Sequence, residues 1–299
     1  MVLRISLIVL LLSTLVCQSV RAGQTGIHDT AVVRILYDRP LQRVAEDIGR
    51  MYPELLSEVE QALQWRLNSR PTIRLVRLEE DFRRMSPVSH VVALAFPGDS
   101  LVVIDYSKMK IRPFTLRTTL KHELCHLLLH AHVPGSNLPK WLDEGVSQWV
   151  SEGIAEVLID VKPQVLHRAL LSGRYIPLRR IGARFPVDPE GLALAYAQSQ
   201  SVVDYIRAEF GARGLLGILR GLQQGQDIDT ALTTTLSLSL NDLEARWLED
   251  TRKRKNWFTF IATHLYGILF FCGAIITVVG FVRFLLRKQA YRDWDEEDQ

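Results

Sequence analysis

A pentapeptide near the middle of the chain places two histidines one helical turn apart. Residues 122–126 read His-Glu-Leu-Cys-His, and Glu144 follows eighteen residues after His126. On a helix, His122 and His126 share one face, so both imidazoles can reach a single zinc ion. Glu123 lies beside that face, where its carboxylate can take a proton from a metal-bound water. With Glu144 as a third ligand, one metal position stays open, and the pattern predicts metal-assisted hydrolysis.

The residues around the motif favour two antiparallel helices. Thr115 to His132 is rich in apolar residues and has neither Gly nor Pro, which predicts a helix through the motif. Residues 133–137 form a cluster of turn residues, and Pro139 suits the first turn of a second helix. A short connection between two helices brings Glu144 back toward the histidine pair. The alternative is a chance motif in which Glu144 is an ordinary solvated carboxylate.

Both segments resemble the gluzincin branch of zinc metallopeptidases. His-Glu-Leu-Cys-His at 122–126, followed by Trp-Leu-Asp-Glu-Gly at 141–145, is similar to the ligand segments of that branch and closer still to bacterial peptidase MA-like domains. Residues 192–199 and 202–206 are similar to the Tyr-containing helix that follows in those domains. The resemblance covers residues 70–250.

The resemblance implies a zinc-dependent enzyme that cleaves peptide or protein substrates. The metal ligands it implies are His122, His126 and Glu144, with Glu123 as the general base. One position departs from the pattern, because thermolysin-like enzymes place an Asp four residues after the Glu ligand to orient a zinc-bound His. This chain has Gln148 there, and a neutral amide raises the basicity of an imidazole less than a carboxylate does. A second hypothesis is therefore a catalytically silent, membrane-tethered interaction domain that retains the fold.

Two other histidines and a cysteine are close enough in sequence to be weighed as ligands. His132 follows His126 at the metzincin spacing, but that arrangement requires Gly at position 129, where this chain has Leu129. A straight helix carries His130 past a single ion, so both histidines are predicted to be polar residues near the helix end. Cys125 lies off the ligand face and is expected to be a small buried residue. The three cysteines do not predict a disulfide framework.

The oxyanion that develops during hydrolysis needs a stabilising group besides the metal. A Tyr hydroxyl is one such group, worth roughly 10²–10³ in rate. Tyr196, in a helix predicted at 192–210, is our candidate catalytic residue, and Tyr205 is its rival. A packing role for either ring stays open, because aromatic residues at helical spacing usually belong to the core.

Apolar segments at both ends of the chain predict the cellular location of the protein. Residues 1–22 have one Arg before a short apolar run, which is typical of a cleavable signal peptide. Residues 257–282 hold no Asp, Glu, Lys or Arg and predict a single transmembrane helix, and 283–299 form a short charged tail. Basic residues flank both sides of that helix equally, so charge does not orient it. The signal peptide predicts a single-pass cell-membrane protein with its catalytic domain outside the cytoplasm, on the periplasmic side in a bacterium.

The part between these ends predicts an α+β fold. For 23–114 the patterns favour strands at 31–37 and 72–78, a helix at 40–67 and a hairpin at 91–105. We expect a small mixed sheet packed on the zinc-binding helix pair. The hairpin is the candidate for an edge that binds extended substrate, and an ordinary sheet that only covers the helix is the alternative.

The region 115–251 predicts a mostly helical continuation of the catalytic part. Beyond the motif, helices are expected at 146–158, 163–171, 192–210, 213–223 and 241–251. Alternating Leu and Ser at 236–240 leave two options open: a short strand, or a plain connection into a last helix capped by Asn241. The net charge of +3 is too small and dispersed to favour a nucleic-acid partner. The oligomeric state is left open.

Overall fold

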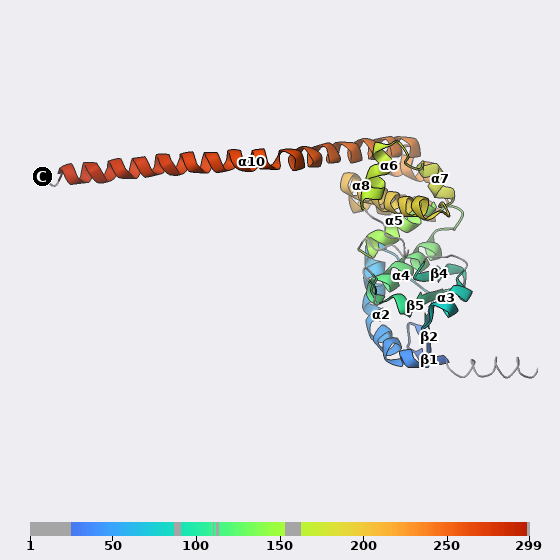
Figure 1. Ribbon diagram of the computed structural model, residues 1–299. Coiled ribbons are helices and arrows are strands. Elements are labelled where there is room, and N and C mark those ends of the chain that lie inside the picture. The colour runs from blue at the N-terminus through green and yellow to red at the C-terminus, as the bar shows by residue number, and fades with distance from the viewer. Residues whose placement is uncertain (1–24, 87–90, 110, 112–113, 153–162, 298–299) are drawn as a thin grey trace, which may run out of the picture. The chain divides into compact units, whose positions relative to one another are not determined.

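The computed structural model describes residues 25–86, 91–109, 111, 114–152 and 163–297 (Figure 1). The chain divides into two compact units, Met1–Glu244 and Ala245–Gln299. The first unit holds the sheet, the two motif helices and the helices that follow them. The signal peptide predicted at 1–22 lies outside the described residues.

A five-stranded mixed sheet forms the N-terminal part of the first unit. The strands are β1 (Thr25–Asp29), β2 (Arg34–Asp38), β3 (Thr72–Val76), β4 (Ala93–Phe96) and β5 (Leu101–Asp105), in the spatial order β1-β2-β3-β5-β4. β2, β3 and β5 run parallel, whereas β1 and β4 are antiparallel to their neighbours at the two edges. The small mixed sheet and the hairpin at 91–105 are therefore confirmed. The sequence does not indicate β1, because Thr-Gly-Ile-His-Asp lacks the apolar alternation of a half-buried strand.

Helices cover both faces of this sheet. They are α2 (Gln42–Leu63), α3 (Glu79–Met85) and α4 (Leu116–His132), and short 3₁₀ helices occupy Arg39–Leu41, Pro97–Asp99 and Tyr106–Lys108. On the α3 face, Val76, Phe82 and Val103 form a buried apolar cluster. Side chains alternate across a strand, so the buried and paired Ile73 and Val102 point to the opposite face, where α2 and α4 contact strands. This packing fixes α4 next to the edge strand β4.

The region after α4 is helical, as predicted. Its helices are α5 (Lys140–Val150), α6 (Pro163–Leu171), α7 (Leu178–Ala183), α8 (Pro189–Gln223) and α9 (Ile228–Leu236). The two helices predicted at 192–210 and 213–223 form α8, which breaks at Gly211 with φ 69° and ψ 177°. Only glycine adopts this backbone conformation readily. The last part of the helix predicted at 146–158 lies outside the described residues.

The connection at 236–240 is a helix start and not a strand. The oxygen Oδ2 of Asp242 accepts hydrogen bonds from N and Oγ of Ser239 at 3.2 and 2.6 Å. In return, Asp242 N donates to Ser239 Oγ at 3.1 Å. This reciprocal pair is a capping box that begins two residues before Asn241, the predicted cap.

The last helix overturns one prediction. α10 (Leu240–Glu297) is a single helix of 58 residues (Figure 1). In the part of the chain that the structure describes, no helix is both long and apolar enough to cross a membrane. The transmembrane helix predicted at 257–282 is therefore wrong. The apolar run is not an element of its own, because the same helix continues through the basic segment 252–255 before it and the charged tail after it.

Candidate metal centre

α4 carries two histidines on its buried side. Thr115 precedes the helix, and its Oγ1 accepts a hydrogen bond from Thr118 N at 3.2 Å, which caps the first turn. One turn separates His122 from His126, so their rings meet edge to face with centroids 4.8 Å apart. Both side chains are buried. The helix predicted from Thr115 to His132 is thus confirmed.

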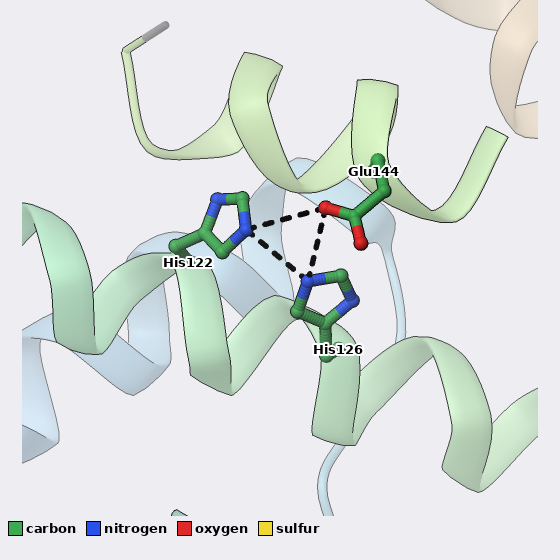
Figure 2. Close-up of side chains that lie close together, drawn as sticks. All are labelled: His122, His126 and Glu144. Carbon is green, nitrogen blue, oxygen red and sulfur yellow. Dashed lines mark hydrogen bonds and ion pairs between the residues drawn. The ribbon is translucent and has the colours of Figure 1, made fainter. Parts of the chain in front are cut away.

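Glu144 reaches the histidines from α5, which packs against α4. α5 begins after Pro139, whose extended backbone ends the short loop between the two helices. Glu144 is fully buried, and its Oε2 lies 3.7 Å from Nε2 of His122 and 3.7 Å from Nε2 of His126 (Figure 2). The structure therefore brings together the three residues predicted as metal ligands.

The three donor atoms fit one zinc ion. The Nε2 atoms of His122 and His126 are 3.2 Å apart, and all three ligand atoms lie within 4.8 Å of one another. Tetrahedral zinc, with bonds of about 2.0–2.2 Å, places its ligand atoms about 3.4 Å apart. Two imidazoles and one carboxylate also match the donor types of catalytic zinc sites, which leave one position open.

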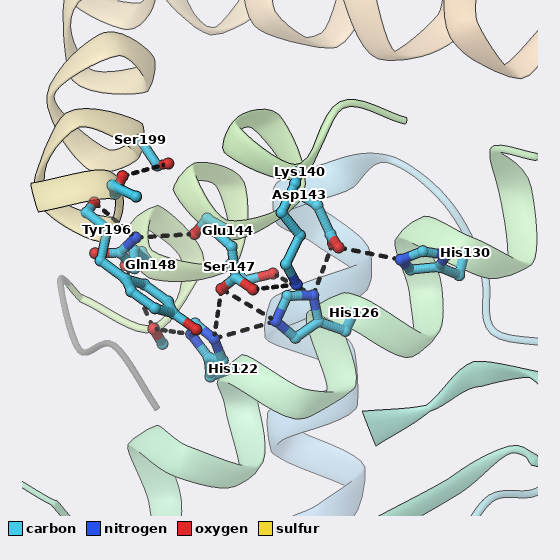
Figure 3. A network of polar contacts seen from close by, with 12 residues as sticks. His122, His126, His130, Lys140, Asp143, Glu144, Ser147, Gln148, Tyr196 and Ser199 are labelled. Atoms are coloured by element: carbon cyan, nitrogen blue, oxygen red, sulfur yellow. Dashed lines mark hydrogen bonds and ion pairs between the residues drawn. The ribbon is translucent and has the colours of Figure 1, made fainter. Parts of the chain in front are cut away.

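A different partner holds the outer nitrogen of each ring (Figure 3). His126 Nδ1 lies 2.7 Å from Oδ1 of Asp143 and 3.3 Å from Oγ of Ser147. His122 Nδ1 lies 3.2 Å from Oγ of Ser151. An ionised carboxylate only accepts hydrogen bonds, so His126 donates from Nδ1 to Asp143. In the neutral ring, the lone pair is then on Nε2, the atom that faces the candidate metal position.

Charges of both signs surround the centre. Burial alone would lower the pKa of His126, but the carboxylates of Asp143 and Glu144 raise it to about 10. Burial would raise the pKa of Glu144, but the Lys140 ammonium, 2.5 Å from Oε1, and His126 lower it to about 2. Burial also opposes ionisation of Asp143, yet His126 and His130 hold its pKa well below the usual range. A dication that binds here meets two ionised carboxylates and displaces a proton from His126.

The two predicted catalytic residues come from different helices. Glu123 follows His122 on α4 and is fully buried. Tyr196 lies on α8, with 4% of its surface exposed, and its ring packs edge to face on Phe185 with centroids 5.2 Å apart. Figure 3 shows the Tyr196 ring extending from α8 toward the side of the centre where His122 lies. Tyr205, its rival, packs against another ring of α8, with centroids 6.4 Å apart.

Asp143 is the residue that the sequence patterns do not indicate. Besides its bond to the nearer histidine, its Oδ2 lies 3.1 Å from Nε2 of His130. Gln148, at the position where the family pattern has the orienting Asp, donates instead to the backbone oxygens of Glu144 at 3.3 Å and Tyr196 at 3.2 Å. The signal that could have revealed Asp143 is a carboxylate directly before the ligand glutamate, with a third histidine one turn further along α4.

Neither of the two other candidate ligands, His132 and Cys125, belongs to the cluster of potential metal ligands in the described part of the chain. His132 Nε2 is 2.8 Å from the backbone oxygen of Arg66, and its ring stacks on Trp65 with centroids 4.8 Å apart. Cys125 is buried, as predicted, and burial raises the pKa of its thiol. A protonated thiol is a poor metal ligand, so Cys125 serves as a core side chain.

Gly145 lets α5 approach α8 directly behind the ligand glutamate. A Cβ atom at this position would lie 2.4 Å from the backbone oxygen of Ser199 and 2.6 Å from Cγ2 of Val203. Gln148 donates to Tyr196 O across the same seam. α8 therefore packs closely against α5 beside Glu144, and the same helix carries Tyr196.

The chain matches the model of a known protein family. The model of the Peptidase MA superfamily matches residues 85–252, more than half of the 299-residue chain. The chain belongs to the Peptidase MA superfamily. The match confirms the resemblance predicted from the two ligand segments. The cluster of His122, His126 and Glu144 has a set of donor atoms suited to a zinc ion.

Several solved structures match this chain at low sequence identity. A variant of the M1 zinc metallopeptidase from Deinococcus radiodurans is 14% identical, with a TM-score of 0.42 over 75% of this chain and 51% of that one. The same variant bound to a Tyr-Ser-Ala substrate is 15% identical, with a TM-score of 0.41 over 75% and 50%. Yeast LTA4 hydrolase in complex with bestatin is 11% identical, with a TM-score of 0.43 over 77% and 37%. The chain thus spans about half of these proteins or less, and no curated protein matched it.

Proposed function

We propose that the protein hydrolyses peptide bonds with a zinc ion held by His122, His126 and Glu144. The observation that carries the proposal is the convergence of three buried donor atoms, 3.2 to 3.7 Å apart, in a chain of the Peptidase MA superfamily. Zinc in such a site acts as a Lewis acid that polarises a carbonyl and acidifies water. The remaining steps belong to side chains of the protein.

Glu123 is the proposed general base. It removes the proton of the attacking water and returns it to the leaving amine. Its place on α4 directly after His122 puts the carboxylate beside the metal ligands, and the side chain is fully buried. A purely structural zinc site has no use for such a base, which argues against a catalytically silent interaction domain. The feature that favoured that alternative was Gln148, but His126 has a carboxylate partner in Asp143.

Tyr196 is the proposed stabiliser of the oxyanion. Gln148 of α5 donates from Nε2 to the backbone oxygen of Tyr196, and Phe185 supports its ring. If its hydroxyl binds the developing oxyanion, Tyr196→Phe should lower kcat roughly 10²–10³-fold with little change in zinc content. The matched control is Tyr205→Phe on the same helix. An equal loss in both variants would instead mean that the Tyr196 hydroxyl has no specific role at the oxyanion.

β4 is the proposed binding edge for an extended peptide. It pairs with β5 on one side, lies at the end of the sheet and contacts α4, the helix of the metal ligands. An edge strand offers unpaired backbone groups to a peptide that adds as a further strand. The substrate is therefore expected to lie extended along β4.

A paired measurement of zinc content and peptide cleavage tests the proposed function. The full-length wild type, Glu123→Gln and the control Glu209→Gln, an exposed position on α8, would be analysed for metal and incubated with a peptide library. We expect one zinc per chain in all three and cleavage in all except Glu123→Gln. Cleavage at the wild-type rate by Glu123→Gln would mean that the activity belongs to another protein or another site.

The proposed place of action is outside the cytoplasm. The support is the sequence of residues 1–22, with its short apolar run and with Ala22 directly before Gly23. N-terminal sequencing of the mature protein should begin at Gly23. A mature chain that still begins at Met1 would overturn this location.

A further inference from the structure

We propose that Asp143 and His130 form a positioning pair that fixes the metal ligand His126. The inference rests on the proposed function, because the pair has this task only if His126 binds a metal. Neither residue is a metal ligand or a catalytic residue in the proposed mechanism. The pair instead acts on the geometry and basicity of a ligand.

The two oxygens of Asp143 face two histidines of the same helix. Oδ1 lies 2.7 Å from His126 Nδ1, and Oδ2 lies 3.1 Å from His130 Nε2. These histidines are one turn apart on α4, so their rings hold the carboxylate, which comes from α5, between them (Figure 3). With both oxygens engaged, the carboxylate cannot rotate away from His126. A buried charge-assisted bond of this length holds an imidazole in one tautomer and one orientation.

The pair takes over the task that the family pattern gives to another position. Gln148 is engaged with two backbone oxygens and contacts neither ligand ring by a hydrogen bond that the structure describes. The outer nitrogen of His122 meets the neutral hydroxyl of Ser151. Among the contacts of the described residues, the outer nitrogen of His126 is therefore the one that a carboxylate supports. A carboxylate raises ligand basicity more than a hydroxyl does.

A cavity explains why a second histidine is needed. A cavity of about 530 Å³ lies on the outer side of the pair, and His130, Asp143 and Lys140 are among the residues that line it. Solvent in this cavity competes for the outer oxygen of Asp143. His130, with 28% of its side chain exposed, lines the same cavity and donates to Oδ2. His130 thus keeps the carboxylate turned toward His126 where water in the cavity could otherwise bind it.

The test measures zinc affinity, which is independent of catalysis. The dissociation constant of the full-length protein would be measured by competition with a chelator, together with the absorption spectrum of the cobalt-substituted protein. Asp143→Asn keeps the shape but removes the charge, and we expect zinc affinity to fall roughly 10–100-fold, as for other outer partners of metal ligands. His130→Ala should lower it about five-fold, the effect of one hydrogen bond. His130→Gln, which restores an N–H donor, should recover part of the loss.

Two controls separate positioning from general damage. His132→Ala changes a histidine on the same helix that bonds to Arg66 O, and it should leave the zinc affinity unchanged. In a double-mutant cycle, His130→Ala should have no further effect once Asp143 is Asn, because His130 acts through that carboxylate. A merely structural role would give additive losses. Thermal unfolding of the metal-free variants reports whether each one folds, and His130→Ala keeps the test open if Asp143→Asn does not.

The outcomes distinguish this inference from the proposed function. If the wild type binds no zinc, both are overturned. If His126→Ala abolishes zinc binding while Asp143→Asn keeps wild-type affinity and an unchanged cobalt spectrum, the positioning role fails and the metal centre stands. Additive losses in the double-mutant cycle, or an equal loss in His132→Ala, would also overturn the positioning role.

Discussion

The metal centre has two halves, each consisting of one histidine ligand and the partner of its outer nitrogen, and the surroundings of the two histidines differ. On one side, His126 is hydrogen-bonded to the carboxylate of Asp143, and this carboxylate also accepts a hydrogen bond from His130. On the other side, His122 meets the hydroxyl of Ser151, itself near the end of α5. Among the described residues, the first half is a charged network, and the second is a hydrogen-bond contact with a neutral hydroxyl. Two histidines that are equivalent in the motif are therefore unequal in the fold.

This difference shows which helix governs the centre. α4 supplies both histidines, but the partners of their outer nitrogens come from the first turn of α5 and from its C-terminal end. α5 also supplies Glu144 between them. A change in α5 should therefore alter the zinc site more than a change of similar size on the outer face of α4.

The largest effect is expected from removal of Glu144, the metal ligand that lies between the two histidines. Glu144→Ala deletes the third ligand and leaves the two histidines with their outer partners. Zinc affinity should fall by more than the roughly 10–100-fold that loss of an outer partner costs. Chelator competition on the full-length protein checks this. If Glu144→Ala kept full zinc while His132→Ala lost it, the ligand set would have to be reassigned.

A smaller effect is expected on the stability of the contact between α5 and α8, which supports both halves of the centre. In Gly145→Ala, the new Cβ would meet Ser199 O at 2.4 Å, so α5 must move away from α8. Overpacking of this kind costs about 1–3 kcal/mol of unfolding free energy. Chemical denaturation measures it, and Gly98→Ala, where no atom lies within 4 Å of the added Cβ, is the control. Equal stability of the two variants would contradict the close approach of α5 and α8.

The smallest effect should come from the neutral half. Ser151→Ala removes the hydroxyl that meets His122 Nδ1, and zinc affinity should fall about five-fold, as expected for one neutral hydrogen bond. The comparison with Asp143→Asn under the same conditions is the decisive one. A larger loss in Ser151→Ala than in Asp143→Asn would reverse the order of the two halves.

The sequence predicts the ligand cluster because helical spacing and turn residues are local signals. Two histidines four residues apart, a turn cluster and a proline at the next helix start are enough to bring Glu144 to the ligand face. The partners of the ligands are harder to predict. Whether Asp143 or Gln148 reaches His126 depends on how α5 is rotated against α4, and tertiary packing sets that rotation.

The two ends of the described chain also contain elements that the local sequence does not predict. β1 forms because its backbone pairs with β2 at an edge, although its residues carry no apolar alternation. The charge-free run at 257–282 indicated a separate membrane span, but it is part of the longer helix α10. For β1, the pairing strand decides the element. For the apolar run, the charged segments on both sides belong to the same helix, so the run does not form a separate element.

The central claim is that two imidazoles and one carboxylate hold the zinc, and X-ray absorption at the zinc edge tests it most directly. For the zinc-loaded full-length protein, the account predicts two imidazole nitrogens and light oxygen ligands at about 2.0–2.2 Å, and no sulfur. A shell at about 2.3 Å would place Cys125 on the metal. A third imidazole, lost in His130→Ala, would place His130 there. Either result would contradict the account.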